Sequence, residues 1–178
     1  MRKIILIGGD LASGKSTYSR YLSEKFNLTL INKDTLKEII GDMYYASNRE
    51  ENKKLSRLSF EMIKYFIKSS KCDIIIESNY KEYEMEELKQ FLSNNDILSL
   101  KFTGEDKLLH ERFLRRLENR HYVHKAQDFT DLNDLIKTQE ELRSVEYIGE
   151  VVGIDVTPYP DLTSNVKLVE KIEEFLKK

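Results

Sequence analysis

The residues with the clearest chemistry lie in a glycine-containing loop near the start of the chain. Gly9, Gly14, Lys15 and Ser16 have the spacing G-x-x-x-x-G-K-S. Glycines let a loop fold its N–H groups around an anion, and a helix that begins near Gly14 points unpaired N–H groups at the same charge. Lys15 can reach the β- and γ-phosphates of a nucleotide, and the Ser16 hydroxyl can bind Mg²⁺. The spacing predicts a triphosphate site made of Gly9, Ala12, Ser13, Gly14, Lys15, Ser16 and Thr17.

Two carboxylates end the next two predicted strands, 28–31 and 73–77. Asp34 follows the first strand and Glu77 closes the second. Phosphoryl transfer to a hydroxyl needs a carboxylate that orients the acceptor and takes its proton, and a group that fixes the metal. We expect Asp34 to act on the acceptor, and Glu77 to hold Mg²⁺ or bind the acceptor. The alternative is structural, with Asp34 as the N-cap of a helix at 35–40 and Glu77 as a cap of the helix after its strand.

The acceptor is expected to lie against residues 34–70. Tyr44, Tyr45 and Arg49 are aromatic or charged side chains in a stretch with little periodicity, which makes them candidate contacts. Asn79, just after the strand that Glu77 closes, is a further candidate for binding the acceptor.

Arginines are concentrated in the segment that predicts a helix over 105–119. Arg112, Arg116 and Arg120 recur every four residues, so on one helix they would form a slowly drifting stripe. We expect a mobile lid at 112–128, in which Arg116 and Arg120 clamp phosphates on closure and Arg112 lies against the adenine. The alternative is an ordinary solvated face with intrahelical acidic partners.

Two further features near these segments need an explanation. His121 and His124 are three residues apart, a spacing found in metal sites, but no complete ligand set accompanies them. We expect a solvent-facing pair. Asp10 is unusual because a negative charge inside a phosphate-binding loop repels phosphate. Its carboxylate must point toward the acceptor or pair with a cation, and the sequence leaves both open.

Apolar runs without alternation are typical of strands that are buried on both faces of a sheet. Runs of this kind predict strands at 3–8 and 73–77, and further strands are predicted at 28–31, 97–102 and 150–156. Helices are predicted at 14–26, 35–40, 50–69, 82–93, 105–119 and 132–147, with a last one capped near Thr163 or Ser164. This alternation predicts a doubly wound α/β sheet in a single domain over 1–178, with ligands at the carboxyl ends of the strands.

The composition restricts the class of protein. The 178 residues include 29 Lys and Arg against 31 Asp and Glu, and this balance argues against a protein that coats DNA or RNA. The single cysteine, Cys72, allows no internal disulfide, and the apolar run after it predicts a partly buried thiol. No run predicts a signal peptide or a membrane span. We expect a cytoplasmic protein, either a monomer or a homodimer.

Several segments together resemble the P-loop kinases of the nucleoside-monophosphate-kinase group. They are Gly9–Thr17, Ile31–Asp34, Ile76–Asn79, the arginine-rich Arg112–His124 and Val152–Thr157. The resemblance covers nearly the whole chain. It extends to small kinases also classed as AAA-type ATPases, with chloramphenicol phosphotransferase, gluconate kinase, shikimate kinase, polynucleotide 5′-kinase and the zeta toxins as relatives. It implies a three-layer fold, a five-stranded parallel sheet of order 2-3-1-4-5, and transfer of the γ-phosphate of ATP with Mg²⁺.

The motifs are specific for the reaction but not for the acceptor, which we expect to be a hydroxyl of a small molecule. No Asp-Gly-x-Pro-Arg follows the strand at 73–77, which argues against a nucleoside monophosphate kinase. A polynucleotide 5′-kinase stays open and would need a basic channel leading to Asp34. A zeta-toxin-like sugar-nucleotide kinase also stays open. From another class, the alternative is a nucleotide-binding regulatory ATPase that acts through a partner.

Overall fold

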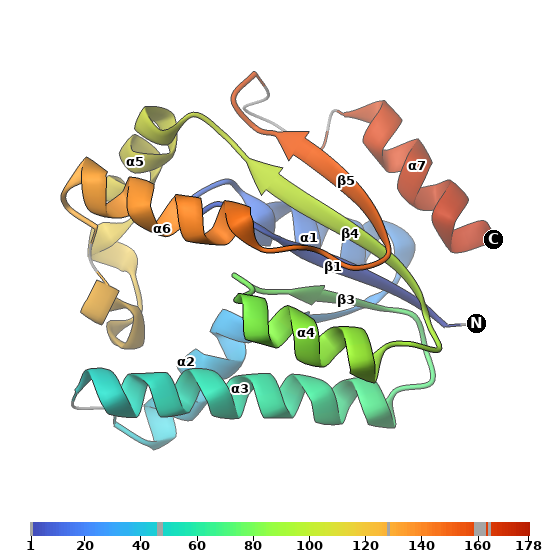
Figure 1. Cartoon of the computed structure of the whole chain (residues 1–178), viewed down its shortest axis with the longest axis horizontal. Helices are drawn as coiled ribbons and strands as arrows, with labels where there is room; N and C mark the ends of the chain where they lie inside the picture. The colour runs from blue at the N-terminus through green and yellow to red at the C-terminus, as the bar shows by residue number, and fades with distance from the viewer. Residues whose placement is uncertain (1, 46–47, 128, 159–162, 164) are drawn as a thin grey trace.

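The central strand of the molecule is β1 (Lys3–Gly9), whose seven residues are all buried. It pairs in parallel with β3 (Ile74–Glu77) and β4 (Asp96–Thr103), and these pair in parallel with β2 (Thr29–Asn32) and β5 (Glu150–Asp155). The structure, a computed structural model, describes residues 2–45, 48–127, 129–158, 163 and 165–178. The five-stranded sheet has the order β2-β3-β1-β4-β5 (Figure 1), so the expected order is confirmed.

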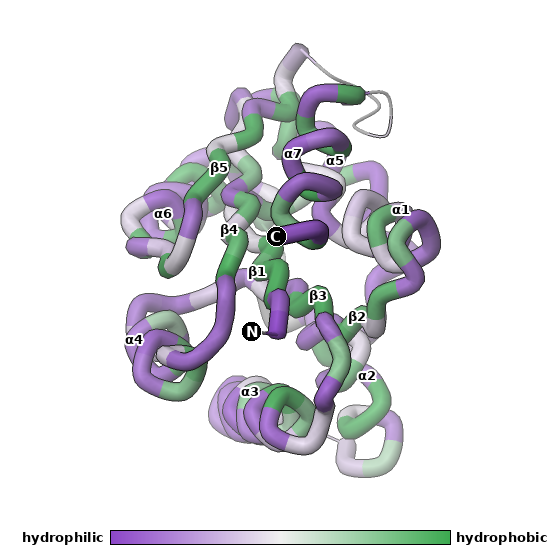
Figure 2. Tube along the Cα trace, turned by 90° about the vertical axis from the view of Figure 1, so that its right-hand side faces the viewer, coloured by the Kyte–Doolittle hydropathy of each residue, from purple (hydrophilic) through white to green (hydrophobic). Residues whose placement is uncertain are grey.

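The helices lie on both faces of this sheet. They are α1 (Lys15–Phe26), α2 (Lys33–Met43), α3 (Arg49–Ser69), α4 (Glu82–Phe91), α5 (Asp106–Leu114), α6 (Leu132–Ser144) and α7 (Val166–Lys177), with the 3-10 turns η1 (Leu117–Asn119) and η2 (Tyr122–Gln127). α1 and α7 lie on one face of the sheet, and α3 and α4 lie on the other (Figure 2). Side chains of each pair of helices pack against the strands on their own face. This is the three-layer α/β architecture that the sequence predicts.

The apolar run in β1 explains how one strand supports two cores. Ile5 and Ile7 pack with α1 and α7, whereas Ile4 and Leu6 pack with α3 and α4. Successive side chains of a strand point to opposite faces, so an uninterrupted apolar run serves both layers. Each of these fully buried side chains contributes about 1.5–3 kcal/mol to stability. The sheet is therefore a rigid base for the loops at its carboxyl edge.

The start of α2 differs from the prediction. The helix begins at Lys33, and its N-cap is Asn32, whose Oδ1 accepts a hydrogen bond from the Thr35 N–H at 2.8 Å. Asp34 therefore lies in the first turn of the helix and does not cap it. The structural alternative for Asp34 is wrong, and its carboxylate is available for other contacts.

The predicted helix at 105–119 is shorter than expected. α5 ends at Leu114, and the chain continues into η1. The buried Phe113 packs against Phe129 with ring centroids 5.5 Å apart, and the Arg120 guanidinium lies 4.6 Å from the Phe113 ring centroid. These tertiary contacts favour a turn of the chain over another turn of helix. The three arginines therefore do not share one helical face, and the predicted stripe is wrong.

Smaller expectations at the surface and at the C-terminal end also differ. Cys72 is exposed, not partly buried. The N-cap of α7 is Asn165, not Thr163, and Ser164 lies outside the described residues. In the described part of the chain, none of the helices combines the length and the apolar character that crossing a bilayer requires.

Glu87 joins α4 to α3, and its contacts predict that the free energy of unfolding falls at acid pH. Its carboxylate accepts hydrogen bonds from Arg57 at 2.6 Å and from Lys64 at 2.7 Å. These bonds lower the pKa of Glu87 from 4.5 to about 2. Because the folded-state pKa lies below the unfolded-state value, the stabilisation is complete above about pH 4.5 and is lost as the pH falls toward 2.

We expect Glu87→Gln to flatten the loss of unfolding free energy between about pH 4.5 and pH 2, measured by urea unfolding at a series of pH values. The exposed neighbour Glu86 provides the control substitution, Glu86→Gln. An acid profile of Glu87→Gln that overlays that of the unmodified protein would contradict the assignment.

Candidate nucleotide and acceptor site

A cleft of about 2170 Å³ opens at the carboxyl edge of the sheet, over the loop that follows β1. The ends of β2 and β3, parts of α2, α3 and α6, and the segment after α5 form its walls. Most of the predicted site residues line it, namely Ala12, Ser13, Gly14, Lys15, Ser16, Thr17, Asp34, Arg49, Glu77, Asn79, Arg116 and Arg120, whereas Gly9, Tyr44, Tyr45 and Arg112 do not. The tertiary structure therefore brings the predicted triphosphate, metal and acceptor residues to one cleft.

The loop between β1 and α1 has the backbone of an anion-binding site. Gly14 has a φ of 87°, a conformation that favours glycine, and no atom lies within 4 Å of where a Cβ would be. In the described residues, the N–H groups from Ala12 to Ser16 have no hydrogen-bond partner. α1 begins at Lys15, so its positive dipole end lies at the same place. These donors fit the phosphate oxygens of a nucleotide.

Lys15 is buried at the base of the cleft. Its ammonium donates to the carbonyl oxygen of Gly9 at 3.1 Å, to that of Asp10, and to the Ser13 hydroxyl at 3.3 Å. Burial lowers the pKa of Lys15, while the Glu77 carboxylate, among other nearby carboxylates, opposes this effect. Because its hydrogen bonds are to neutral groups of the loop, the ammonium can turn toward phosphates when a nucleotide binds.

Glu77 lies directly beneath the loop, and three side chains hold it. Its Oε1 accepts a hydrogen bond from the Ser16 hydroxyl at 2.7 Å. Its Oε2 accepts one from the Ser19 hydroxyl at 2.9 Å and another from the Asn32 amide. The N-cap of α4 is Lys81, so Glu77 does not cap that helix and the structural alternative is wrong. The sequence does not predict Ser19 or Asn32 as site residues, although the register of β2 against β3 pairs Asn32 with Glu77.

Ser16 and Glu77 have the chemistry of a partial magnesium site. A hydroxyl and a carboxylate oxygen lie 2.7 Å apart beside the loop, and Mg²⁺ prefers oxygen ligands. In the part of the chain that the structure describes, no three or more His, Cys, Asp or Glu side chains gather as a metal site. Mg²⁺ in nucleotide sites takes one or two protein ligands together with phosphates and waters. The residues present therefore fit a metal that arrives with a nucleotide.

Asp10 points away from the cleft. Its fully buried carboxylate accepts three hydrogen bonds from the Arg143 guanidinium at 2.6–3.1 Å and one from the Gly104 N–H at 3.1 Å. Arg143, near the end of α6, also donates to Asp106 at 2.7 Å and to the Gly104 carbonyl oxygen at 2.9 Å. Of the two possibilities open from the sequence, pairing with a cation is the one observed. The guanidinium neutralises the charge that would otherwise oppose phosphate.

A second residue of α6 holds the same loop. The Gln139 side chain accepts a hydrogen bond from the Leu11 N–H at 2.8 Å and donates one to the Leu11 carbonyl oxygen at 3.3 Å. Gln139 and Arg143 are four residues apart and so share one face of the helix. The sequence predicts neither residue. The only indication in the sequence is the negative charge of Asp10, which calls for a nearby cation but does not show which residue supplies it.

Asp34 faces the cleft as an exposed carboxylate on the first turn of α2. It is close enough to Lys15 to raise the pKa of that lysine, and Arg116 is close enough to lower it. The phosphate-binding loop, Asp34 and Arg116 therefore share one region. A triphosphate on the loop and a hydroxyl at Asp34 would be neighbours there.

The segment after α5 is folded onto α2. His121 Nε2 lies 2.9 Å from a carboxylate oxygen of Asp42, and His124 Nε2 lies 3.0 Å from one of Glu38. The expected solvent-facing pair is therefore wrong, because both rings contact carboxylates of α2. Burial lowers the pKa of His124, and the Asp34 and Glu38 carboxylates act in the opposite direction. These contacts hold residues 121–124 against α2, which forms part of the wall of the cleft.

The aromatic candidates for the acceptor lie elsewhere. Tyr44 and Tyr45 are not among the described residues that line the cleft, and both are exposed. The Tyr45 ring stacks on that of Tyr122 with centroids 5.4 Å apart. Arg49 and Asn79 do line the cleft, as predicted.

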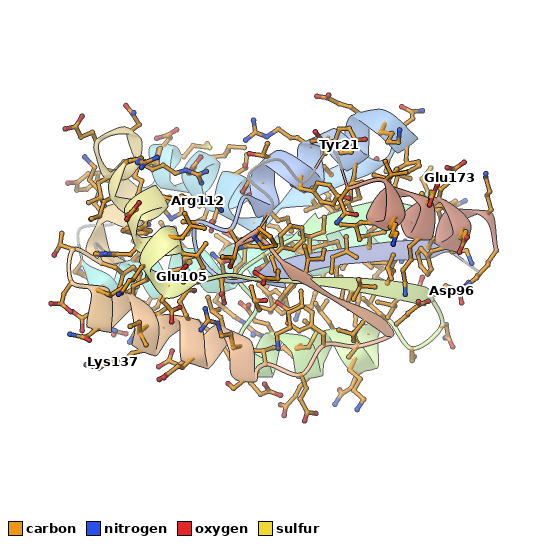
Figure 3. All side chains as sticks on the ribbon, turned by 90° about the horizontal axis from the view of Figure 1, so that it is seen from above. Tyr21, Asp96, Glu105, Arg112, Lys137 and Glu173 are labelled. Atoms are coloured by element: carbon orange, nitrogen blue, oxygen red, sulfur yellow. The ribbon has the colours of Figure 1, made fainter. Side chains whose placement is uncertain are left out.

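Two predicted nucleotide-binding residues lie outside the cleft. Gly9 has a φ of 113°, and a Cβ there would collide with the Phe102 carbonyl of β4, so the strand contact by itself requires a glycine. Arg112 is half-buried in the last turn of α5. Figure 3 shows it at the same end of the molecule as Lys137 of α6, which does line the cleft.

Comparisons with known proteins agree with this geometry at the level of the fold. No protein-family model matches the chain, and no curated protein matches it. A putative kinase from Chloroflexus aurantiacus is similar in structure, with a TM-score of 0.78, 21% identity, and coverage of 96% of this chain and 97% of that chain. A shikimate kinase from Bacteroides thetaiotaomicron has a TM-score of 0.65, 16% identity and coverage of 98% of both chains. A gluconokinase from Sinorhizobium meliloti has a TM-score of 0.59, 17% identity, and coverage of 97% and 98%. The chain therefore has the three-layer α/β fold of the P-loop kinases.

Proposed function

We propose that this protein is a kinase that transfers the γ-phosphate of ATP, with Mg²⁺, to a hydroxyl group of a small-molecule acceptor. The observation that carries the proposal is the single cleft in which unpaired loop N–H groups and Lys15 face the exposed carboxylate of Asp34. The similar solved structures are named as a putative kinase, a shikimate kinase and a gluconokinase, which supports this class of reaction.

Each group in the cleft has a part in this proposal. The loop N–H groups and Lys15 bind the triphosphate, and Ser16 and Glu77 hold the metal, which when bound neutralises phosphate charge. Asp34 orients the acceptor hydroxyl and accepts its proton as the oxygen attacks the γ-phosphorus. The remaining predicted residues act around this centre: Arg116 and Arg120 on the phosphates, Arg112 at the nucleotide, and Arg49, Glu77 and Asn79 at the acceptor.

The chain would act as one kinase domain, with the acceptor bound by residues 34–70 and covered by a lid at 112–128. The contacts of His121 with Asp42 and of His124 with Glu38 support this arrangement, because they join the two segments that would enclose an acceptor. Opening and closing of such a segment would admit the acceptor and exclude water from the transfer.

The proposal is tested by ATP consumption with Mg²⁺ against pools of acceptors. The pools are sugars, nucleosides, antibiotics, sugar acids, sugar nucleotides and 5′-hydroxyl oligonucleotides. Stimulation by a small-molecule pool well above the background with water is expected, and mass spectrometry would then locate the new phosphate ester. Stimulation by oligonucleotides alone would indicate a polynucleotide kinase. ATP bound tightly with no stimulation by any pool would contradict the proposal in favour of a regulatory ATPase.

We expect Asp34→Asn to lower the turnover of acceptor phosphorylation by about 10²–10⁴-fold and to leave ATP affinity nearly unchanged. An amide keeps the shape of the carboxylate but takes no proton, and in the described residues no hydrogen bond or ion pair joins Asp34 to the loop that would bind the triphosphate. The measurement is kcat for the acceptor beside the Kd for ATP. Glu24→Gln, an exposed carboxylate on α1 outside the cleft, is the control. Unchanged turnover in Asp34→Asn would remove Asp34 from the chemistry.

A further inference from the structure

The wall of the cleft next to Asp34 is rich in positive charge. Lys37 of α2, Arg49 of α3 and Lys81 before α4 all line it. In the described residues, none of these three side chains lies within ion-pair distance of a carboxylate. The wall therefore holds three cations from separate parts of the chain, and in the described residues none of them forms an ion pair.

Lys37 is the most enclosed of these cations. Its ammonium donates to the Asn52 Oδ1 at 2.6 Å, which is a neutral partner, and Asn52 is itself held because its amide donates to the Val123 carbonyl oxygen. Burial lowers the pKa of Lys37, and the nearby Lys33 and Lys81 ammonium groups act in the same direction. A half-buried ammonium of this kind has two further N–H donors to satisfy, and a lysine can accept no hydrogen bond.

The three cations lie on the lining of the cleft that also holds Asp34. Asp34 and Lys37 are three residues apart on α2 and are therefore neighbours on its surface, and the Asp34 carboxylate acts against the lowering of the Lys37 pKa by burial. Arg49 precedes Asn52 by three residues on α3 and so shares its face of the helix. An acceptor hydroxyl at Asp34 would therefore place the rest of the acceptor against this wall.

The carboxylates on the same side of the cleft form no ion pair with these three cations. Glu38 is hydrogen-bonded to the His124 ring at 3.0 Å. Glu82 also lines the cleft, but it lies on the first turn of α4, where the helix N-terminus stabilises a carboxylate. Asp34 faces the position proposed for the acceptor hydroxyl, and Lys33 forms a buried ion pair with Glu84. In the described residues the three cations therefore have no direct counter-ion.

We propose that the acceptor carries an anionic group, a phosphate or a carboxylate, which lies against Lys37 and Lys81 with Arg49 at its edge while the hydroxyl faces Asp34. The inference rests on the proposed function, because it names the class of acceptor for that reaction. Hydrogen bonds between ammonium or guanidinium groups and an anion are about twice as strong as neutral ones. An anion would satisfy the donors of Lys37, whereas a neutral acceptor would give the three cations no ion-pair partner.

The first test compares acceptors that differ only in the anionic group. Nucleosides are paired with nucleoside 5′-monophosphates, and sugars with their sugar phosphates and sugar acids, and kcat/KM is measured for each. We expect kcat/KM to be at least about 100-fold higher for the anionic member of each pair. Comparison of the sugar phosphates with the sugar acids then shows whether the acceptor carries a phosphate or a carboxylate. Equal or better use of neutral members would overturn the inference and leave the proposed function standing.

The second test does not depend on turnover. Inorganic phosphate and, separately, malonate are titrated calorimetrically into the full chain whose phosphate-binding loop is filled by a non-hydrolysable ATP analogue and Mg²⁺. We expect saturable binding of at least one anion, weakened about tenfold or more by Lys37→Met and by Lys81→Met. Lys54→Met, an exposed lysine of α3 outside the cleft, is the matched control and should bind as the unmodified protein does.

Lys37→Met removes a hydrogen bond to Asn52 and could weaken anion binding by disturbing the fold. Lys81→Met avoids this problem, because Lys81 is exposed and its ammonium has no hydrogen-bond partner in the described residues. The inference is overturned if neither anion binds, or if both lysine variants bind as tightly as the control. Failure of the proposed function would look different, with no phosphate transferred to any acceptor while the titration still reports on the anion site.

Discussion

Lys15→Met is expected to reduce phosphoryl transfer by at least about 10³-fold while the protein stays folded. The substitution keeps an unbranched side chain of similar length but removes the only buried ammonium at the base of the loop in the described residues. In the structure this ammonium contacts only neutral groups, the carbonyl oxygens of Gly9 and Asp10 and the Ser13 hydroxyl. Its removal therefore breaks no direct ion pair, so the protein should still fold.

The measurement for Lys15→Met is acceptor-dependent phosphate transfer together with a thermal unfolding curve. The control is Lys25→Met, the same substitution in the last turn of α1, far from the loop. This variant should retain full activity. A Lys15→Met protein that unfolds at the normal temperature and still turns over would remove the phosphate-binding loop from the mechanism.

Arg143→Met is expected to lower the free energy of unfolding by about 3 kcal/mol or more. Asp10 has no exposed surface, and Arg143 supplies three of its hydrogen bonds, so the substitution leaves a buried carboxylate without its counter-charge. The same guanidinium also bonds Asp106 and the Gly104 carbonyl, so its loss loosens the start of α5 as well as the loop. The Asp10 carboxylate, the main cause, raises the pKa of Arg143, so the guanidinium stays charged throughout the neutral range.

Urea unfolding of a double-mutant cycle measures this pair. Asp10→Asn together with Arg143→Met should recover part of the stability lost in Arg143→Met, because no buried charge then remains unpaired. Arg115→Met is the control, since its contact with Glu111 is 3.7 Å long and fully at the surface, where an ion pair contributes less than about 1 kcal/mol. A loss in Arg143→Met no larger than in this control would contradict the role assigned to the pair.

The sequence by itself determines the elements that depend on local pattern. The continuous apolar runs of β1 and β3 predict strands buried on both faces, and the glycine, lysine and serine spacing after β1 predicts the anion-binding loop. The two strands are confirmed, because backbone conformation and hydrophobic periodicity act over a few neighbouring residues, whereas anion binding by the loop stays a prediction. The resemblance of several motifs taken together implied the strand order, which the structure confirms. Because the carboxyl ends of parallel strands meet at one edge of the sheet, Asp34 and Glu77 lie in one cleft.

Only the tertiary structure decided which side chains meet. Asp10 and Arg143 are 133 positions apart, and no local pattern marks one as the partner of the other. α5 ends early because Phe113 packs against Phe129, a contact that overrides the helical spacing of the arginines. The cationic wall beside Asp34 joins Lys37, Arg49 and Lys81 from separate elements, and packing of α2 and α3 at the edge of the sheet brings them together. Local sequence sets backbone conformation, whereas pairing of distant charges depends on how the layers pack and on the cost of leaving a buried charge alone.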